Sequence, residues 1–181
     1  ETVRDGDLEI VLAGPTGYGN NVFVVIDRSS GEAAFIDAPG EPDVNVTAAV
    51  AAGVSPAKSL LTHGHFDHTP AIEALKKKFG SRLYADGAEP GLKDGQLDAA
   101  VKHGDEVKVG NLIFRVVSVS GHTPGSTAYV CGKHAFVGGT LCGLAVTADP
   151  LVYIATFTAT AGFAGGVKVT VATSIYTDAA G

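Results

Sequence analysis

Up to residue 137, the hydrophobic positions fall into short runs rich in β-branched residues, separated by turns that contain glycine or proline. Such runs are typical of buried or half-buried strands. They predict strands at residues 8–13, 22–27, 33–37, 59–62, 82–85, 106–109, 112–119, 127–131 and 134–137. Short turns join six of these runs in pairs, which predicts three hairpins, turning at residues 28–31, 110–111 and 132–133.

Two stretches repeat apolar residues at the spacing of an amphipathic helix. The first is residues 43–52, and the second begins after Thr69 and stops at Gly80. Thr69 is expected to cap the second helix, and a glycine is a common residue at a helix C-terminus. Residues 86–100 are polar and poorly patterned, so they predict no element.

Composition limits the number of domains and the kinds of partner. A chain of 181 residues with 45% hydrophobic and 18% charged residues can bury one substantial core, so we expect a single domain over residues 1–181. The formal charge of −6 and the lack of an arginine-rich stripe argue against a nucleic-acid partner. A small-molecule substrate is the expected partner, and the oligomeric state is left open.

Cysteine usage and the first residues bear on the compartment. Cys131 and Cys142 are too few for a disulfide framework, and they fit a reducing compartment about as well as a single bridge. Residues 1–7 lack a positively charged segment followed by an apolar one, so no signal peptide is expected. No early run is long and apolar enough to span a membrane. The expectation is a soluble, cytoplasmic protein.

Three of the six histidines lie within residues 63–68, directly after an apolar run. If that run is a strand, the following loop projects His63 and His65 the same way and places Asp67 and His68 on a neighbouring face. Neutral imidazoles with a carboxylate suit a zinc-class divalent ion, so the two sets predict two metal positions. The alternative is a group of ordinary polar loop residues at a strand end.

These residues carry a resemblance to a known family. His63-Gly64-His65-Phe66-Asp67-His68 matches the His-x-His-x-Asp-His signature of the metallo-β-lactamase superfamily, and residues 121–126, Gly-His-Thr-Pro-Gly-Ser, match its second motif. The resemblance covers about residues 8–141. It implies an α+β fold, an αββα sandwich of two mixed sheets with outer helices, and metals held by loops at one edge of the sheets. It also implies hydrolytic chemistry.

The second motif adds His122 to the predicted ligands. A buried structural histidine is the alternative, but the flanking glycines and proline describe an exposed, tight turn. His63, His65 and His122 then form a three-histidine zinc site with a fourth position open for water, and the bound water ionises near neutral pH to give the nucleophile. Asp67 and His68 either hold a second ion, or Asp67 orients the hydroxide and transfers its proton to the leaving group.

The sequence departs from the family where the second metal is held. The glyoxalase II-like branch has Gly-Asp-Thr-Leu after the third hairpin, whereas this chain has Gly138-Gly139-Thr140-Leu141, without the bridging carboxylate. Cys142 stands two residues too late to replace a cysteine ligand of lactamase-like members, and no histidine follows His134. We therefore expect one well-occupied zinc ion and a weak or empty second position.

Residues 143–181 form an atypical closing part of the predicted domain. They are dominated by Ala, Thr, Gly and Val, and charged residues are rare among them. An amphipathic outer helix normally has a polar face, which this composition does not supply. The alternation in residues 153–158 is compatible with a divergent set of strands.

Four functions are compatible with these motifs. The leading one is a zinc-dependent hydrolase of an ester, thioester or related acyl substrate, similar to hydroxyacylglutathione hydrolases. A β-lactam hydrolase is the first alternative, and a metal-binding relative with impaired or no catalysis is the second. An iron-dependent sulfur dioxygenase of the same superfamily is the most remote of the four. His103 and His134 are expected at the surface, outside the site.

Overall fold

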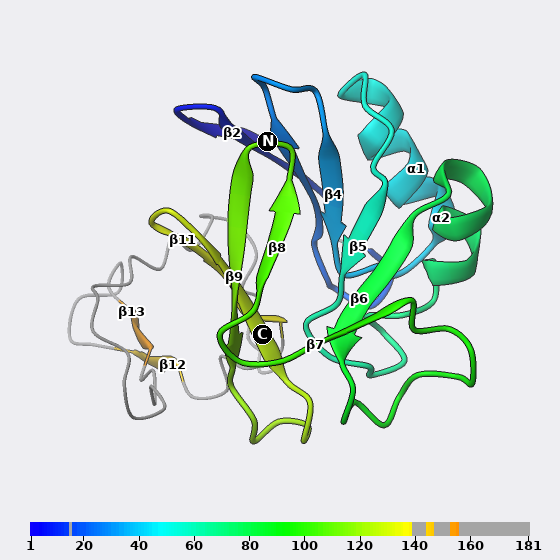
Figure 1. The fold of residues 1–181 in the computed structure, drawn as a ribbon, viewed down its shortest axis with the longest axis vertical. Helices are drawn as coiled ribbons and strands as arrows, with labels where there is room; N and C mark the ends of the chain where they lie inside the picture. The colour runs from blue at the N-terminus through cyan, green and yellow to red at the C-terminus, as the bar shows by residue number, and fades with distance from the viewer. Residues whose placement is uncertain (15, 139–143, 147–152, 156–181) are drawn as a thin grey trace.

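The computed structural model describes residues 1–14, 16–138, 144–146 and 153–155. Seven of its strands form one sheet and four form a second sheet (Figure 1). The first sheet contains, in spatial order, β1 (Thr2–Asp5), β2 (Leu8–Ala13), β3 (Val22–Asp27), β4 (Ala33–Ile36), β5 (Lys58–Leu60), β6 (Arg82–Asp86) and β7 (Ala99–Val101). The second contains β11 (His134–Phe136), β10 (Thr127–Cys131), β9 (Leu112–Ser118) and β8 (Glu106–Val109).

The first sheet changes from antiparallel to parallel pairing at β4. Strands β1 to β4 pair antiparallel, and β4 to β7 pair parallel. Parallel neighbours need a crossover connection, and helices α1 (Pro42–Ala51) and α2 (Ile72–Phe79) supply the first two. Both helices lie on the outer face of this sheet (Figure 1). The carboxyl ends of β4, β5 and β6 therefore lie at one edge, where their loops can meet.

The second sheet is antiparallel throughout its described strands, because short turns join β8 to β9 and β10 to β11. The first sheet is mixed, as expected, but the prediction that the second sheet is also mixed is wrong, since all of its described strand pairs are antiparallel. Together the two sheets and the outer helices confirm the predicted α+β sandwich. Outside these sheets, β12 (Leu144–Val146) and β13 (Tyr153–Ala155) pair antiparallel with each other, and β13 lies in the stretch whose alternation suggested a strand.

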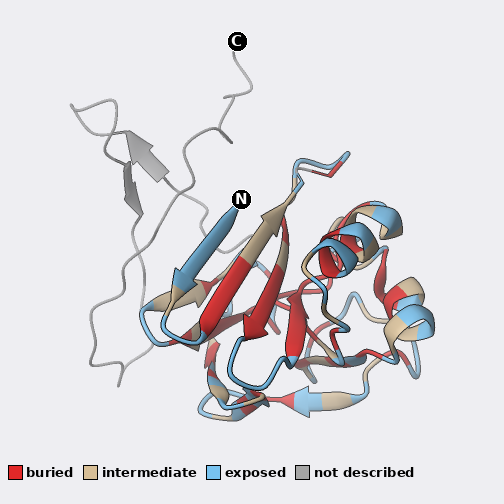
Figure 2. Cartoon of the chain, turned by 90° about the horizontal axis from the view of Figure 1, so that it is seen from above, coloured by how far each residue is buried: buried red, intermediate tan, exposed pale blue. Residues whose placement is uncertain are grey.

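Side-chain alternation along the strands produces two apolar layers. In β3, Val25 contributes to the core between the sheets, whereas Val24 and Ile26 face the layer under the helices. Tyr129 and Phe114 are fully buried between the sheets, and the outward faces of α1 and α2 are exposed (Figure 2). Both faces of the first sheet are covered, which explains why its central strands are nearly continuous apolar runs.

Most of the strand predictions are confirmed to within one or two residues. The sequence did not predict β1 and β7, which are short, and it wrongly assigned the cap of α2. The N-cap is Ala71 and not Thr69. The Thr69 hydroxyl instead donates to the carbonyl of His65, and Ala71 N–H donates to the carbonyl of Ala38. The turn before α2 is therefore held by the histidine loop and by the loop after β4.

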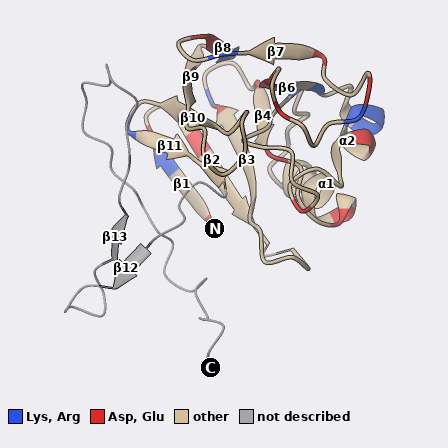
Figure 3. Cartoon of the chain, turned by 90° about the horizontal axis from the view of Figure 1, so that it is seen from below, with Lys and Arg blue, Asp and Glu red and all other residues tan. Residues whose placement is uncertain are grey.

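Charged residues lie mainly on the helices, the loops and the outer strands (Figure 3). The cluster at residues 76–78 forms the last turn of α2. Within this cluster, Lys76 is half-buried and forms an ion pair with Asp98. None of the described helices is both long and apolar enough to cross a membrane.

Asp27 joins the two sheets at the end opposite the histidines' loops. Its buried carboxylate accepts hydrogen bonds from the side chains of Ser29 and Ser30 and from the backbone N–H groups of Ser29 and Asn111, at 2.6–2.9 Å. The Ser29 hydroxyl is the main cause that lowers the pKa of Asp27, followed by the Asn111 N–H. The ionised form is thus preferred by the folded protein.

We expect Asp27→Asn to lower the free energy of unfolding at neutral pH and to reduce its dependence on acid. A carboxyl whose pKa is lowered on folding contributes stability above its unfolded pKa of about 3.9, and this contribution disappears as the pH falls through the folded pKa. Denaturant unfolding measured between about pH 6 and about pH 3 should therefore show that the free energy of unfolding falls less in the variant than in the wild type. Equal losses would show that Asp27 does not couple folding to pH.

Candidate metal centre

His63 and His65 lie in the loop that follows β5. The end of this strand is fixed from both sheets: Leu61 N–H donates to the carbonyl of Tyr84 at 2.8 Å, and the Tyr129 hydroxyl donates to the carbonyl of Leu61 at 3.0 Å. The backbone just before His63 therefore has little freedom. His63 itself is buried, with 2% of its surface exposed.

His122 comes from the loop between β9 and β10, in the other sheet. Val119 N–H donates to the carbonyl of Ser126 at 2.9 Å and closes this loop. Thr127 N–H, at the start of β10, donates to the carbonyl of Thr62 at 2.8 Å. This bond joins the two sheets directly beside the histidines, so the loop of His122 is held against the loop of His63.

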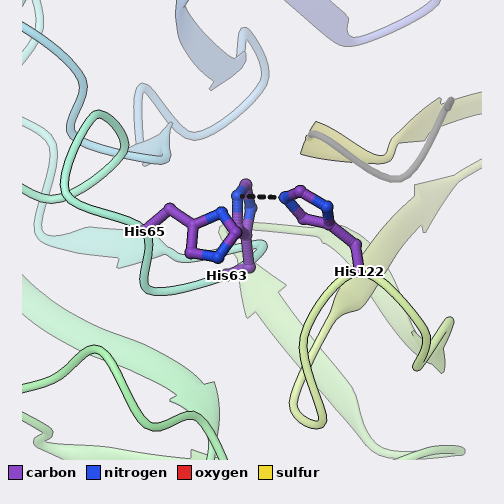
Figure 4. Close-up of side chains that lie close together, drawn as sticks. All are labelled: His63, His65 and His122. Atoms are coloured by element: carbon purple, nitrogen blue, oxygen red, sulfur yellow. Dashed lines mark hydrogen bonds between the residues drawn. The ribbon is translucent and has the colours of Figure 1, made fainter.

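The three imidazoles converge, as Figure 4 shows. One ring nitrogen from each of His63, His65 and His122 lies within 4.8 Å of the others, and the ring centroids are 4.5–4.8 Å apart. The Nε2 atoms of His63 and His122 are 3.2 Å apart. These three side chains are the set that the sequence predicted as one metal position, and the structure brings them together.

Burial favours the neutral form of the His63 and His122 rings, since it lowers the pKa of both. Burial is the main cause that lowers the pKa of His63 to about 4, and the nearby His68 lowers it further. Burial also lowers the pKa of His122, followed by the charge of His65. A histidine binds a metal ion through the lone pair of its neutral ring. At neutral pH the rings of His63 and His122 are therefore in the form that binds a cation.

The donor set fits a zinc ion. Two imidazoles that bind one tetrahedral zinc at about 2.0–2.1 Å place their nitrogens about 3.3 Å apart, and the distance between His63 Nε2 and His122 Nε2 is 3.2 Å. Three histidines leave one of four tetrahedral positions open, which is the arrangement of catalytic rather than structural zinc sites.

Asp67 and His68 lie next to this cluster but outside it. The His68 ring is 4.1 Å from that of His63, and its Nε2 lies 3.6 Å from Asp67 Oδ2. Asn20 donates to Asp67 Oδ2 at 2.9 Å. Burial raises the pKa of Asp67, but the Asn20 bond and the charge of His68 outweigh it, so the pKa is lowered overall. Their roles as ligands of a second ion, and of Asp67 in catalysis, stay predictions.

Asp37, at the end of β4, holds the loop of His63 and His68 in place, and the sequence analysis missed it. Its carboxylate accepts hydrogen bonds from Thr62 N–H at 2.7 Å, from the Thr62 hydroxyl at 2.9 Å and from His68 Nδ1 at 2.9 Å. Because Nδ1 donates, the Nε2 atom of His68 is directed to Asp67. Burial lowers the pKa of His68, but the bond to Asp37 outweighs it and the pKa is raised.

We expect Asp37→Asn to lower the free energy of unfolding by about 2–3 kcal/mol, because the amide nitrogen replaces an acceptor and leaves a buried donor without a partner. Asparagine tolerates the left-handed backbone of this position, φ 60°, so the change isolates the hydrogen bonds. Denaturant unfolding measures the effect, with Asp43→Asn on the exposed face of α1 as the control. Equal stability of the two variants would contradict the role of Asp37.

The remaining candidates of the sequence analysis lie elsewhere. His103 is exposed, as predicted, and accepts a hydrogen bond from Ser118 N–H. His134 is partly buried and contacts Asp5 at 3.1 Å, so the prediction of a surface position is only partly met. Gly138 packs against Thr62 and His63, whereas residues 139–142, including Cys142, lie outside the described residues.

The amino-acid sequence of this chain is similar to those of known proteins. A hydroxyacylglutathione hydrolase from Anaeromyxobacter dehalogenans is 36% identical over 124 residues, which are 68% of this chain and 48% of the relative. The chain spans about half the length of the curated relatives that it matches. A family model described as a bacterial Ig-like domain matches residues 128–181, and the beginning of this match overlaps β10 and β11 of the second sheet.

Solved structures share the fold. The crystal structure of ETHE1 from Myxococcus xanthus superposes with a TM-score of 0.60 at 25% identity, covering 76% of this chain and 55% of that chain. A metallo-beta-lactamase from Staphylococcus aureus subsp. aureus COL superposes with a TM-score of 0.60 at 21% identity, covering 71% of this chain and 40% of that chain. At that lower identity, the likeness shows the fold alone.

Proposed function

The chain belongs to the metallo-β-lactamase superfamily, and on this premise we propose that it is a zinc-dependent hydrolase of a thioester, ester or related acyl compound. The proposal is carried by one observation: three imidazoles, from loops of two different sheets, converge with one nitrogen from each within 4.8 Å of the others, and the Nε2 atoms of His63 and His122 have a separation that suits one tetrahedral ion. Histidine rings in this arrangement, with one position open, are the ligand set of a hydrolytic zinc site.

His63, His65 and His122 would hold the ion. A zinc ion held there would supply a Lewis acid for the acyl carbonyl and would lower the pKa of a bound water to about 7. Asp67 accepts the proton that leaves the attacking water and passes it to the leaving group, since its lowered pKa keeps it ionised at neutral pH. Asn20 fixes the direction of this carboxylate through its bond to Oδ2.

A cavity beside His65 provides room for a substrate. Its volume is about 520 Å³, within the usual range for small-molecule sites. Phe66 and Pro70 are its apolar wall, and Glu73, Lys93 and Gln96 supply polar groups. The Lys93 side chain makes no ion pair among the described residues. A substrate that combines an apolar acyl part with a polar leaving group matches this lining.

The curated relatives support a thioester substrate, since they are hydroxyacylglutathione hydrolases with identities of 34–36%. A β-lactam is the second candidate. Metallo-beta-lactamases of solved structure match this chain at 20–24% identity, which supports the fold and not the substrate. We also propose that one zinc ion is well occupied, because Asp67 and His68 alone would hold a second ion weakly.

The test is hydrolysis by the zinc-loaded protein. S-lactoylglutathione, a simple aryl ester and a chromogenic cephalosporin should be compared, after metal analysis has established the zinc content. We expect thioester cleavage to be fastest and the zinc content to be close to one per chain. Full zinc loading without cleavage of any of the three substrates would overturn the proposal in favour of a non-catalytic relative.

A further inference from the structure

A buried acidic residue, Glu89, lies between the two loops that carry the histidines. It belongs to the loop between β6 and β7 and is only 7% exposed. One carboxylate oxygen, Oε1, is buried without a hydrogen-bond partner among the described residues. Burying a carboxylate oxygen without a hydrogen bond costs free energy. The other contacts of Glu89 therefore need to be considered for a role that explains its burial.

Glu89 contacts the loop of His122 through Thr123. The Thr123 hydroxyl donates to Glu89 Oε2 at 2.6 Å. Thr123 N–H donates to the Ser126 hydroxyl at 2.9 Å, and the two hydroxyl oxygens are 2.9 Å apart. Because the proton of Thr123 goes to the carboxylate, the Ser126 hydroxyl donates to Thr123. This directed chain of hydrogen bonds ends on Glu89.

Glu89 also fills the space between two glycines next to the histidines. Gly64 separates His63 from His65, and a Cβ there would lie 3.0 Å from Glu89 Cγ and 3.1 Å from Oε1. A Cβ at Gly125, in the other loop, would lie 2.8 Å from the Cα and backbone N of Glu89. Both loops therefore approach Glu89 as closely as their backbones permit, one from each side.

We propose that Glu89 is a positioning residue of the metal centre: it sets the distance between the loop of His63 and His65 and the loop of His122. The inference rests on the zinc site proposed above and deepens it. Glu89 does not touch the ion; it acts through Thr123 and through close packing against Gly64 and Gly125. Groups that orient the ligands of a metal typically change its affinity by 10- to 100-fold when they are removed.

Two variants separate the contribution of the side-chain volume and hydrogen bond of Glu89 from that of its charge. Glu89→Ala removes both the acceptor for Thr123 and the volume between the glycines. Glu89→Gln keeps the volume and one acceptor oxygen and removes the charge. We expect zinc affinity, measured by competition with a chromophoric chelator, to fall about 10- to 100-fold in Glu89→Ala and to change less than about threefold in Glu89→Gln. The visible spectrum of the cobalt-substituted protein should change only in Glu89→Ala, because the histidines no longer converge.

Val109→Ala is the control for a general loss of stability. Val109 is fully buried in the core between the sheets, at the far end of the hairpin from the histidines. This variant should be destabilised in denaturant unfolding and should keep the wild-type zinc affinity and cobalt spectrum.

The outcomes distinguish two failures. Wild-type affinity and spectrum in Glu89→Ala would overturn the role of Glu89, as would an equal loss of affinity in Val109→Ala. A wild-type protein that binds neither zinc nor cobalt would overturn the proposed hydrolase together with this inference.

Discussion

The His65→Ala variant is expected to lose acyl hydrolysis and to bind zinc on the order of 100- to 1000-fold more weakly than the wild type. Structural zinc sites bind with about 10–16 kcal/mol, so one ligand of four contributes about 2.5–4 kcal/mol. His65 is exposed, and its truncation leaves no cavity in the core. The stability of the fold should therefore be unaffected, and only zinc affinity and hydrolysis should be lost. Zinc competition and substrate hydrolysis measure both effects.

His103→Ala is the matched control, because this histidine is also exposed and lies outside the cluster. It should retain zinc and activity. If His65→Ala kept the affinity of the wild type, the three-histidine site would be wrong. If it lost affinity but kept hydrolysis, the ion would be structural and the proposed chemistry would be wrong.

The Gly91→Ala variant is expected to displace the histidines, because the added Cβ would clash with the backbone of Gly64. A Cβ at Gly91 would lie 1.8 Å from the carbonyl oxygen of Gly64 and 2.9 Å from its Cα. The two loops must then move apart by more than an ångström, which displaces His63 and His65 relative to His122. A misplacement of this size typically costs about 100-fold in rate. We expect a loss of that order in hydrolysis, with weaker zinc binding.

The Gly87→Ala variant tests whether the loss of hydrolysis and zinc affinity is caused by the close contact between residues 64 and 91. The nearest atom to a Cβ at Gly87 is the Cβ of Ala100, at 3.6 Å, an ordinary contact in the same β6–β7 region. Hydrolysis and zinc affinity should be close to wild type in that variant. A Gly91→Ala protein that behaves like Gly87→Ala would show that the approach of residues 64 and 91 does not position the histidines.

Periodicity predicted most of the sandwich because its strands are apolar runs bounded by turn residues. The bounds of β2 and β3 follow directly from the sequence. Strand β1 was missed because it is short and largely exposed, and β7 was missed because it has only three residues, of which Val101 alone is buried. A strand of three or four residues with at most one buried position shows no alternating apolar pattern. The sequence also could not show that Thr69 bonds to His65 instead of capping α2.

The site was only partly predictable, because local motifs point to candidate ligands but not to the groups that support them. The signature at residues 63–68 and the glycine-rich turn around His122 stand out in the sequence. Asp37 and Glu89 are single acids with no local pattern, and only tertiary contacts bring them beside the histidines. A carboxylate directly after the apolar run of β4 was the available signal for Asp37. For Glu89, the sequence offers none.

Anomalous diffraction at the zinc edge from crystals of the zinc-loaded protein tests the central claim most directly. The proposal predicts one strong peak between His63, His65 and His122, about 2.0–2.1 Å from one nitrogen of each ring. A peak elsewhere in the molecule, or three rings that turn apart with no ion between them, would contradict it.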